Sequence, residues 1–107
     1  MNLSTLVVSY KSIIKLEKCL NTIGNVGEIL IIENSDNIEI KKRIESKYKN
    51  CKVIINNDNL GWSRAANIGL NEIKTQYVII LNPDTLIEDN QFIEIENEIN
   101  NLNGIIY

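Results

Sequence analysis

Asp84 is the carboxylate in this sequence with the strongest case for a chemical role. It stands in LNPDT at 81–85, directly after the apolar run YVII at 77–80 and next to the chain's only proline. A plain turn would also explain Asn-Pro-Asp, because proline fixes φ and an Asp side chain closes turns. At the carboxyl end of a sheet strand, however, this carboxylate could supply one oxygen to Mg²⁺ or Mn²⁺. Such a cation would need substrate phosphates for its other ligands and is expected to bind weakly without a nucleotide.

Other polar side chains follow the remaining apolar runs of the sequence. Ser9 and Tyr10 come after the first run, Glu33 continues the second, and NNDNLG at 56–61 follows the third. Each residue taken singly is what an ordinary loop uses, because Asn, Asp, Ser and Gly dominate turns. Glu33 extends a buried run and is expected to be at least partly enclosed. Together with Asp84 these residues form a polar set that suits a sugar or a nucleotide with its cation better than an apolar ligand.

Strands and helices alternate along the chain and determine where these residues lie. We predict strands at 3–9, 28–32, 52–55 and 77–81. Four helices are predicted: one at 12–24, one that begins after the capping residues 35–37, one at 62–73 and one around 92–102. The strands are continuous apolar runs, so both faces of their sheet are expected to be covered. This order, with short connections, predicts an α/β fold: an open, mostly parallel, doubly wound sheet with helices on both faces. Ligands of such sheets bind beyond the carboxyl ends of the strands.

The helices carry their own cap and core signals. Ser12 is predicted to cap the first helix. The helix at 62–73 is predicted to bury Ala66, Leu70 and Ile73, which share one side. Arg64 would oppose the helix dipole if it lies in the first turn, and we expect it to be exposed.

Composition excludes several classes of protein. The 107 residues suffice for one domain with one core. The 11 basic and 14 acidic residues give a net charge of −3, which argues against a nucleic-acid partner, since such proteins carry a clustered basic face. The basic stretch at 41–49 is predicted to be the solvated side of a helix. The sequence contains no histidine, which excludes histidine-based catalysis and imidazole metal ligands. Cys19 and Cys51 are predicted to be buried free thiols.

The two ends of the chain bear on its setting and its completeness. The amino-terminal residues lack the pattern of a signal peptide, and no run approaches the ~20 apolar residues of a membrane span. We therefore expect a cytoplasmic protein with no membrane span. Near the other end, Asn103 and Gly104 break the last predicted helix, and residues 105–107 begin what looks like a fifth strand. Residues 1–107 are thus expected to form an incomplete domain that is truncated near this strand.

Three other kinds of nucleotide or phosphate site lack their defining residues. A dinucleotide-binding G-x-G-x-x-G should follow the first strand, but SYKSII at 9–14 contains no glycine. The sequence also contains no G-x-x-x-x-G-K-[ST] loop. A receiver-type phosphoacceptor pocket would need acidic residues after the first and third strands, where this chain has Ser9-Tyr10 and Asn56-Asn57.

Four segments, in order, match a known pattern at the ends of the four predicted strands. They are VVSYKSIIKLEKCLNTI at 7–23, EILIIENSDN at 28–37, NDNLGWSRAANIGL at 57–70 and YVIILNPDTLIED at 77–89. Together they resemble the amino-terminal half of the family 2 glycosyltransferases of GT-A fold, and the rhamnosyltransferase-like branch in particular. The resemblance covers almost the whole chain, and the order of the four segments makes it specific.

The resemblance implies a role for each matching residue. The implied nucleotide-binding residues are Ser9, Tyr10, Glu33, Asn59, Gly61, Asn67 and Asn82. The first three would surround the base, the next three would close over base and ribose, and the last would lie near the ribose. Asp84 would be the metal ligand of a D-x-D-type motif. Glu33 stands where the family usually has Asp. Asn67 is read equally well as an ordinary helix-surface amide, and Trp62 as a packing residue.

The resemblance also implies a reaction that this chain does not complete. Family members of this kind are inverting, metal-dependent enzymes. The implied donor is a UDP- or dTDP-sugar, and the implied acceptor of a full-length form is a glycan or a lipid-linked molecule. The family's catalytic base and acceptor-binding residues lie after the D-x-D motif, in a part that is absent here, so the catalytic residue is unknown. Lys11 departs from the family's usual Asn.

Two other hypotheses remain open at this point. The chain could be a non-catalytic, degenerate module that binds a partner or forms a homo-dimer through an open sheet edge. It could also be another doubly wound nucleotide-binding enzyme that shares these loops. A nucleotide that binds away from Asp84 would favour the last hypothesis.

Overall fold

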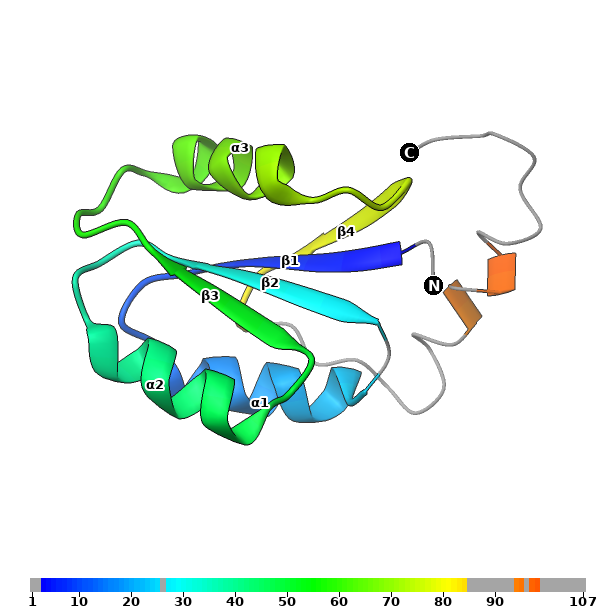
Figure 1. Cartoon of the computed structure of the whole chain (residues 1–107), viewed down its shortest axis with the longest axis horizontal. Helices are drawn as coiled ribbons and strands as arrows, with labels where there is room; N and C mark the ends of the chain where they lie inside the picture. Colours follow the sequence, from blue (N-terminus) through cyan, green and yellow to red (C-terminus); the bar gives the residue numbers. More distant parts are fainter. Residues whose placement is uncertain (1–2, 26, 85–93, 96, 99–107) are drawn as a thin grey trace.

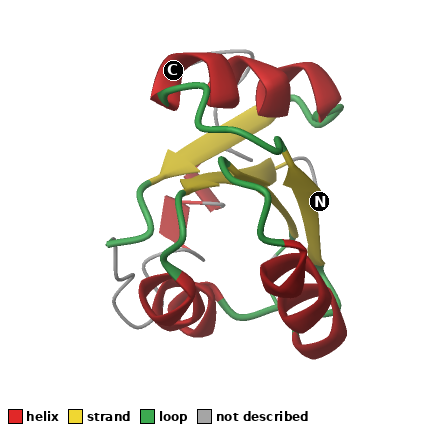
Figure 2. Cartoon of the chain, turned by 90° about the vertical axis from the view of Figure 1, so that its left-hand side faces the viewer, coloured by secondary structure: helices red, strands yellow, loops and turns green. Residues whose placement is uncertain are grey.

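Four parallel strands form the sheet of the computed structural model, which describes residues 3–25, 27–84, 94–95 and 97–98. In chain order the elements are β1 (Leu3–Ser9), α1 (Ile13–Ile23), β2 (Glu28–Glu33), α2 (Ile38–Lys47), β3 (Cys51–Ile55), α3 (Trp62–Glu72) and β4 (Tyr77–Leu81). The predicted α/β fold is confirmed, with α1 and α2 on one face of the sheet and α3 on the other (Figure 1, Figure 2). The predicted helix around 92–102 and the predicted strand at 105–107 lie outside the described residues, except that 94–95 and 97–98 are helical.

The order of the strands creates one switch point in the sheet. The strands lie in the order β3-β2-β1-β4, so the chain moves outward from β1 to β3 and then returns to the far side of β1. The strands pair in register, with Ser9 beside Glu33 and Val7 beside Leu81. In open α/β sheets the crevice at such a reversal is where ligands bind. Here it lies between the carboxyl ends of β1 and β4.

The two faces of the sheet are packed differently. Alternate strand residues contribute to a cluster under α1 and α2 that includes Val7, Ile31 and Val53, all fully buried. The other face packs against α3 through Leu6 and Ile32. Strand residues therefore find apolar partners on both sides, which is why the sequence runs are continuous instead of alternating.

The buried side of α3 differs from the prediction. Ala65, Ala66 and Gly69 are buried, whereas Leu70 is 40% exposed. A Cβ atom on Gly69 would collide with the Leu6 side chain, so this helix approaches the sheet through its small residues. The predicted burial of Leu70 was wrong because the spacing of hydrophobic residues does not show that the helix backbone approaches the sheet at Gly69.

Capping of α1 also differs from the prediction. Ser12 occupies the N-cap position, but its hydroxyl donates to the carbonyl of Tyr10 at 2.7 Å, and it makes no cap bond to the helix. At α2 the expected cap is present, because the Asn37 side chain accepts a hydrogen bond from the N–H of Glu39.

Both cysteines are buried free thiols, as predicted, and burial raises the pKa of Cys51 to about 12. Among the described residues, no helix is long and apolar enough to cross a membrane.

Helices α1 and α2 are joined by a charged cluster on Glu17. Arg43 donates to Glu17 at 2.5 Å, and the Lys47 ammonium lies 3.2 Å from the same carboxylate. Burial by itself would raise the pKa of Glu17. The hydrogen bonds and charges of Arg43 and Lys47 outweigh that effect and hold the pKa below its ordinary value of 4.5. Part of the basic stretch at 41–49 therefore ties two helices together.

Acid is expected to weaken the fold through this cluster. A carboxyl group whose folded pKa is depressed stabilises the fold above its unfolded pKa, and this contribution disappears as pH falls through the folded pKa. The Glu17→Gln variant should therefore lose about 0.5–1 kcal/mol at neutral pH, since both cationic partners are largely exposed. It should also lose less stability than wild type below about pH 4.5. Urea unfolding at neutral and acid pH measures both effects. Equal losses in acid for Glu17→Gln, wild type and the exposed control Glu39→Gln would contradict the assignment.

Candidate functional site

The polar residues that follow β1, β2 and β3 gather at one edge of the sheet, where the three loops lie side by side (Figure 1). Register explains this arrangement, because Ser9 pairs with Glu33 and Glu33 pairs with Ile55. The three strands thus end at the same level, because their last residues pair with one another. The sequence prediction that these loops converge is confirmed.

Glu33 is buried at this edge. Its side chain is 0% exposed, so burial is complete where the sequence predicted at least partial enclosure. One oxygen, Oε2, accepts hydrogen bonds from the backbone N–H of Lys11 at 3.0 Å and from the Ser35 hydroxyl at 2.5 Å. The other, Oε1, has no hydrogen-bond partner among the described residues, and neither has the hydroxyl of Ser9. A buried acceptor without a donor is costly, so the edge holds unused hydrogen-bonding capacity.

The β1–α1 loop adopts an unusual conformation to reach Glu33. Lys11 has φ +47°, in the left-handed region that costs a non-glycine residue about 1–2 kcal/mol. This conformation directs its N–H at the Glu33 carboxylate. The Lys11 ammonium lies 5.5 Å from the ring centroid of Tyr10, which is 49% exposed. Tyr10 therefore forms an exposed rim, and Glu33 and Ser9 form the buried base of the edge.

Asn34 connects the end of β2 to the loop before α3. Its amide donates to Asn59 Oδ1 at 3.0 Å and to the Gly61 carbonyl at 3.2 Å. Its oxygen accepts from the Asn56 amide and from the Leu60 N–H, both at 3.0 Å. These four bonds use the full hydrogen-bonding capacity of the side chain, which is 3% exposed. Asn34 was not among the predicted site residues, and no sequence signal marks it, because its partners lie 22 to 27 residues away along the chain.

A small pocket of about 170 Å³ opens above these residues. Its lining residues are Tyr10, Lys11, Ser35, Asp36, Asn57, Asp58 and Asn59. It is smaller than the roughly 300–1,000 Å³ of a typical ligand pocket and offers room for one ring system. Of the predicted nucleotide-binding residues, Tyr10 and Asn59 line it directly. Glu33 lies behind it, bonded to Lys11 and Ser35 in its wall.

The predicted residues of α3 lie at or beyond the rim of this pocket. Gly61 is the N-cap residue and has φ +81°, a conformation that favours glycine. Asn67 is exposed on the helix, which fits either of its two interpretations. Trp62 is 54% exposed and so lies outside the core, and its packing role stays a prediction. Arg64 lies in the first turn of α3 and is exposed, as expected.

Asp84 lies across the switch point, in the turn that follows β4. Its N–H donates to Asn82 Oδ1 at 3.0 Å, which closes the Asx turn that Asn-Pro-Asp favours. Its carboxylate is 64% exposed and pairs with the Lys15 ammonium of α1 at 3.1 Å. The turn and an exposed carboxylate are therefore compatible, since the backbone N–H closes the turn while the side chain pairs with Lys15.

The donor set near Asp84 limits what cation could bind. Among the described residues, no group of three or more His, Cys, Asp or Glu side chains could hold a metal ion. A single exposed carboxylate fits Mg²⁺ or Mn²⁺ only if ligand phosphates complete the coordination. The residues present thus suit a cation that arrives with a diphosphate, and they do not form a protein-only cage.

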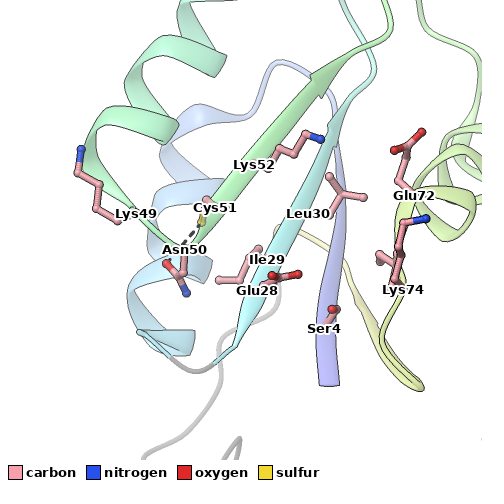
Figure 3. A pocket seen from close by; sticks show the side chains of 11 residues that line it. Ser4, Glu28, Ile29, Leu30, Lys49, Asn50, Cys51, Lys52, Glu72 and Lys74 are labelled. Carbon is pink, nitrogen blue, oxygen red and sulfur yellow. Dashed lines mark hydrogen bonds between the residues drawn. The ribbon is translucent and has the colours of Figure 1, made fainter. Parts of the chain in front are cut away.

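A larger pocket of about 490 Å³ lies at the opposite edge of the sheet, where β1, β2 and β3 begin (Figure 3). Lys52 and Lys74 flank Leu30 there, with Glu72 nearby. None of the predicted site residues lines this pocket. Ligands of open α/β sheets bind beyond the carboxyl ends of the strands, so the smaller pocket at the carboxyl edge is the candidate site.

Comparisons with known proteins bear on the family and the fold of the chain. The family model described as glycosyl transferase family 2 matches residues 4–106. The low-salt glycan biosynthesis hexosyltransferase Agl10 of Haloferax volcanii is 29% identical over an alignment of 87 residues, with coverage of 78% of this chain and 28% of that protein. The crystal structure of S. aureus TarS 1–349 superposes with a TM-score of 0.77 at 19% identity, over 94% of this chain and 33% of that one. The chain spans about a third of the length of these relatives.

Proposed function

The chain belongs to glycosyl transferase family 2, and from this premise we propose that its carboxyl edge binds the nucleotide of a sugar donor. In this proposal residues 1–107 are the donor-binding part of an inverting, metal-dependent glycosyltransferase. The whole reaction needs more than this part, because the chain covers 28% of Agl10 and 33% of the TarS chain. The cytoplasmic setting and the rhamnosyltransferase-like branch are parts of the same proposal.

The observation that carries this proposal is the buried carboxylate of Glu33. Its Oε1 accepts no hydrogen bond from any described residue, and its Oε2 is tied to two residues of the pocket wall. An ionised carboxylate accepts hydrogen bonds and donates none, so a ligand that pairs with it must present an N–H or O–H. The imide N–H of uracil or thymine is such a donor, which supports a UDP- or dTDP-sugar.

The diphosphate would lie toward the switch point, between this pocket and Asp84. The Asp84 carboxylate would hold Mn²⁺ or Mg²⁺ together with the phosphates, and the cation would offset the charge of the leaving diphosphate. Lys15 would be released from Asp84 as the cation binds, because both compete for the same oxygen. The acceptor, a glycan or a lipid-linked molecule, and the base that deprotonates it would be supplied from outside the residues described.

Nucleotide titration tests this function. The chain should bind UDP or dTDP more tightly with Mn²⁺ than without it, by roughly tenfold, and Asp84→Ala should remove that gain. Calorimetry with each nucleotide, with and without Mn²⁺, measures both effects. Glu72→Ala, which deletes an exposed carboxylate at the opposite edge, serves as the control. Nucleotide binding that is equally tight with and without Mn²⁺ and is unchanged by Asp84→Ala would contradict the metal assignment. The absence of any nucleotide binding would contradict the proposed function.

A further inference from the structure

Strand β3 is an outer strand of the sheet among the described residues, and its outward backbone groups need partners. It pairs with β2 on one side only. Along β3, successive residues direct their N–H and C=O alternately toward β2 and away from it. The Asn50 carbonyl accepts from the Ile29 N–H, and the Asn56 N–H donates to the Glu33 carbonyl, so the even-numbered residues face β2. Val53 therefore directs its N–H and C=O away from β2. Such outward groups are a template on which another strand can pair.

Two side chains of α2 occupy these outward groups. Lys41 Nζ donates to the Val53 carbonyl at 2.5 Å, and Glu45 Oε2 accepts from the Val53 N–H at 2.8 Å. Lys41 and Glu45 also pair with each other at 2.8 Å, which closes a ring of three polar contacts. We call this pair of residues the edge clamp. Beside it, the Cys51 N–H donates to the Tyr48 carbonyl at 3.1 Å.

The edge clamp differs from an ordinary surface ion pair. Its two side chains are 34% and 33% exposed, whereas Lys42 and Glu39 on the same helix pair at 3.5 Å with exposures of 68% and 76%. Burial alone would raise the pKa of Glu45, but the hydrogen bonds from Lys41 and the Val53 N–H hold it below the ordinary value. The clamp is bonded to the backbone of β3, and no such bond is recorded for the Lys42–Glu39 pair.

We propose that the edge clamp keeps β3 from pairing with β3 of a second copy of this chain. Without the clamp, two copies could meet as antiparallel strands around Val53, whose N–H and C=O would be exchanged between the chains. With the clamp in place, the sheet is closed to strand addition on this side. Among the described residues, the homo-dimer through an open sheet edge, expected as an alternative from the sequence, would then be left with the β4 edge. This inference is independent of nucleotide binding.

The experiment compares two double variants of the same helix. Lys41→Ala with Glu45→Ala opens the edge clamp, and Lys42→Ala with Glu39→Ala removes the exposed pair as a matched control. In sedimentation velocity over a wide concentration series, the clamp variant should reach the mass of a dimer, twice that of the control, while wild type and control stay unchanged. A clamp variant that is folded by circular dichroism and sediments as the control does at every concentration would overturn the proposal.

Amide hydrogen exchange at Val53 decides the outcomes that sedimentation leaves open. In wild type this amide should exchange slowly, because Glu45 accepts its hydrogen bond. It should exchange faster in the dilute clamp variant and become protected again on association. A fast Val53 amide in wild type would overturn the proposal even if the clamp variant fails to fold. Association that leaves Val53 unprotected would place the contact elsewhere and would overturn it as well.

Discussion

Replacing Asn34 with alanine is expected to lower the free energy of unfolding by about 3–4 kcal/mol, since four hydrogen bonds of about 1 kcal/mol each are lost. The partners left behind include the Leu60 N–H and the Gly61 carbonyl, which lie in a partly buried loop. For a domain of this size the melting temperature should fall by roughly 15 °C. Thermal and urea unfolding measure the change.

The control for this prediction is Asn71→Ala, which deletes an exposed amide of α3. Its melting temperature should stay within a few degrees of wild type, because exposed substitutions usually change stability by less than about 0.5 kcal/mol. If Asn34→Ala melts together with Asn71→Ala, the loop at 56–61 is held by other contacts. Asn34→Asp should fall between the two, since it keeps the acceptor oxygen and loses both donated bonds.

Replacing Glu33 with glutamine is expected to weaken nucleotide binding by roughly tenfold to a hundredfold, the loss of one hydrogen bond to a charged group. Glutamine keeps one oxygen and replaces the other with an NH₂ donor. If the oxygen faces Lys11 and Ser35, as Oε2 does now, the NH₂ group takes the place of Oε1 and faces the donor of the base. Calorimetric titration with UDP and dTDP measures the loss.

Glu33→Asp separates the role of the charge from the role of its position. The shorter side chain keeps a carboxylate at this edge, so binding should stay within about tenfold of wild type, less than the loss on charge removal. Glu39→Gln removes an exposed carboxylate of α2 and should leave the affinity unchanged. Unaltered affinity in Glu33→Gln would mean that this carboxylate only supports the pocket wall and does not accept from the base.

The strands were predictable because each is a continuous apolar run that needs cover on both faces. Glu28–Ile32 and Lys52–Ile55 were each predicted within one residue of the observed strand. The convergence of the loops followed from parallel order alone. The buried side of α3 was not predictable from apolar spacing, since Gly69 carries no hydrophobic signal and is buried by the close approach of backbone to sheet.

The site was predictable in its positions and not in its bonding. Ser9, Glu33 and Asn59 were placed correctly at the carboxyl edge, because strand ends are visible in the sequence. The role of Asn34 was not visible, because its partners lie 22 to 27 residues away along the chain. Nothing in the sequence distinguishes an asparagine that bonds a distant loop from one that ends a turn.

The left-handed conformation of Lys11 has a consequence for how this position varies among related sequences. The contact that matters there comes from the backbone N–H, which any residue except proline supplies. A substitution there therefore changes mainly the conformational free energy of the loop, which is lowest for glycine, asparagine and aspartate and highest for β-branched residues. Asparagine, which the resemblance implies at this position in the family, tolerates the same left-handed conformation that Lys11 adopts here. A lysine at this position thus changes the conformational free energy of the loop and keeps the backbone N–H that bonds Glu33.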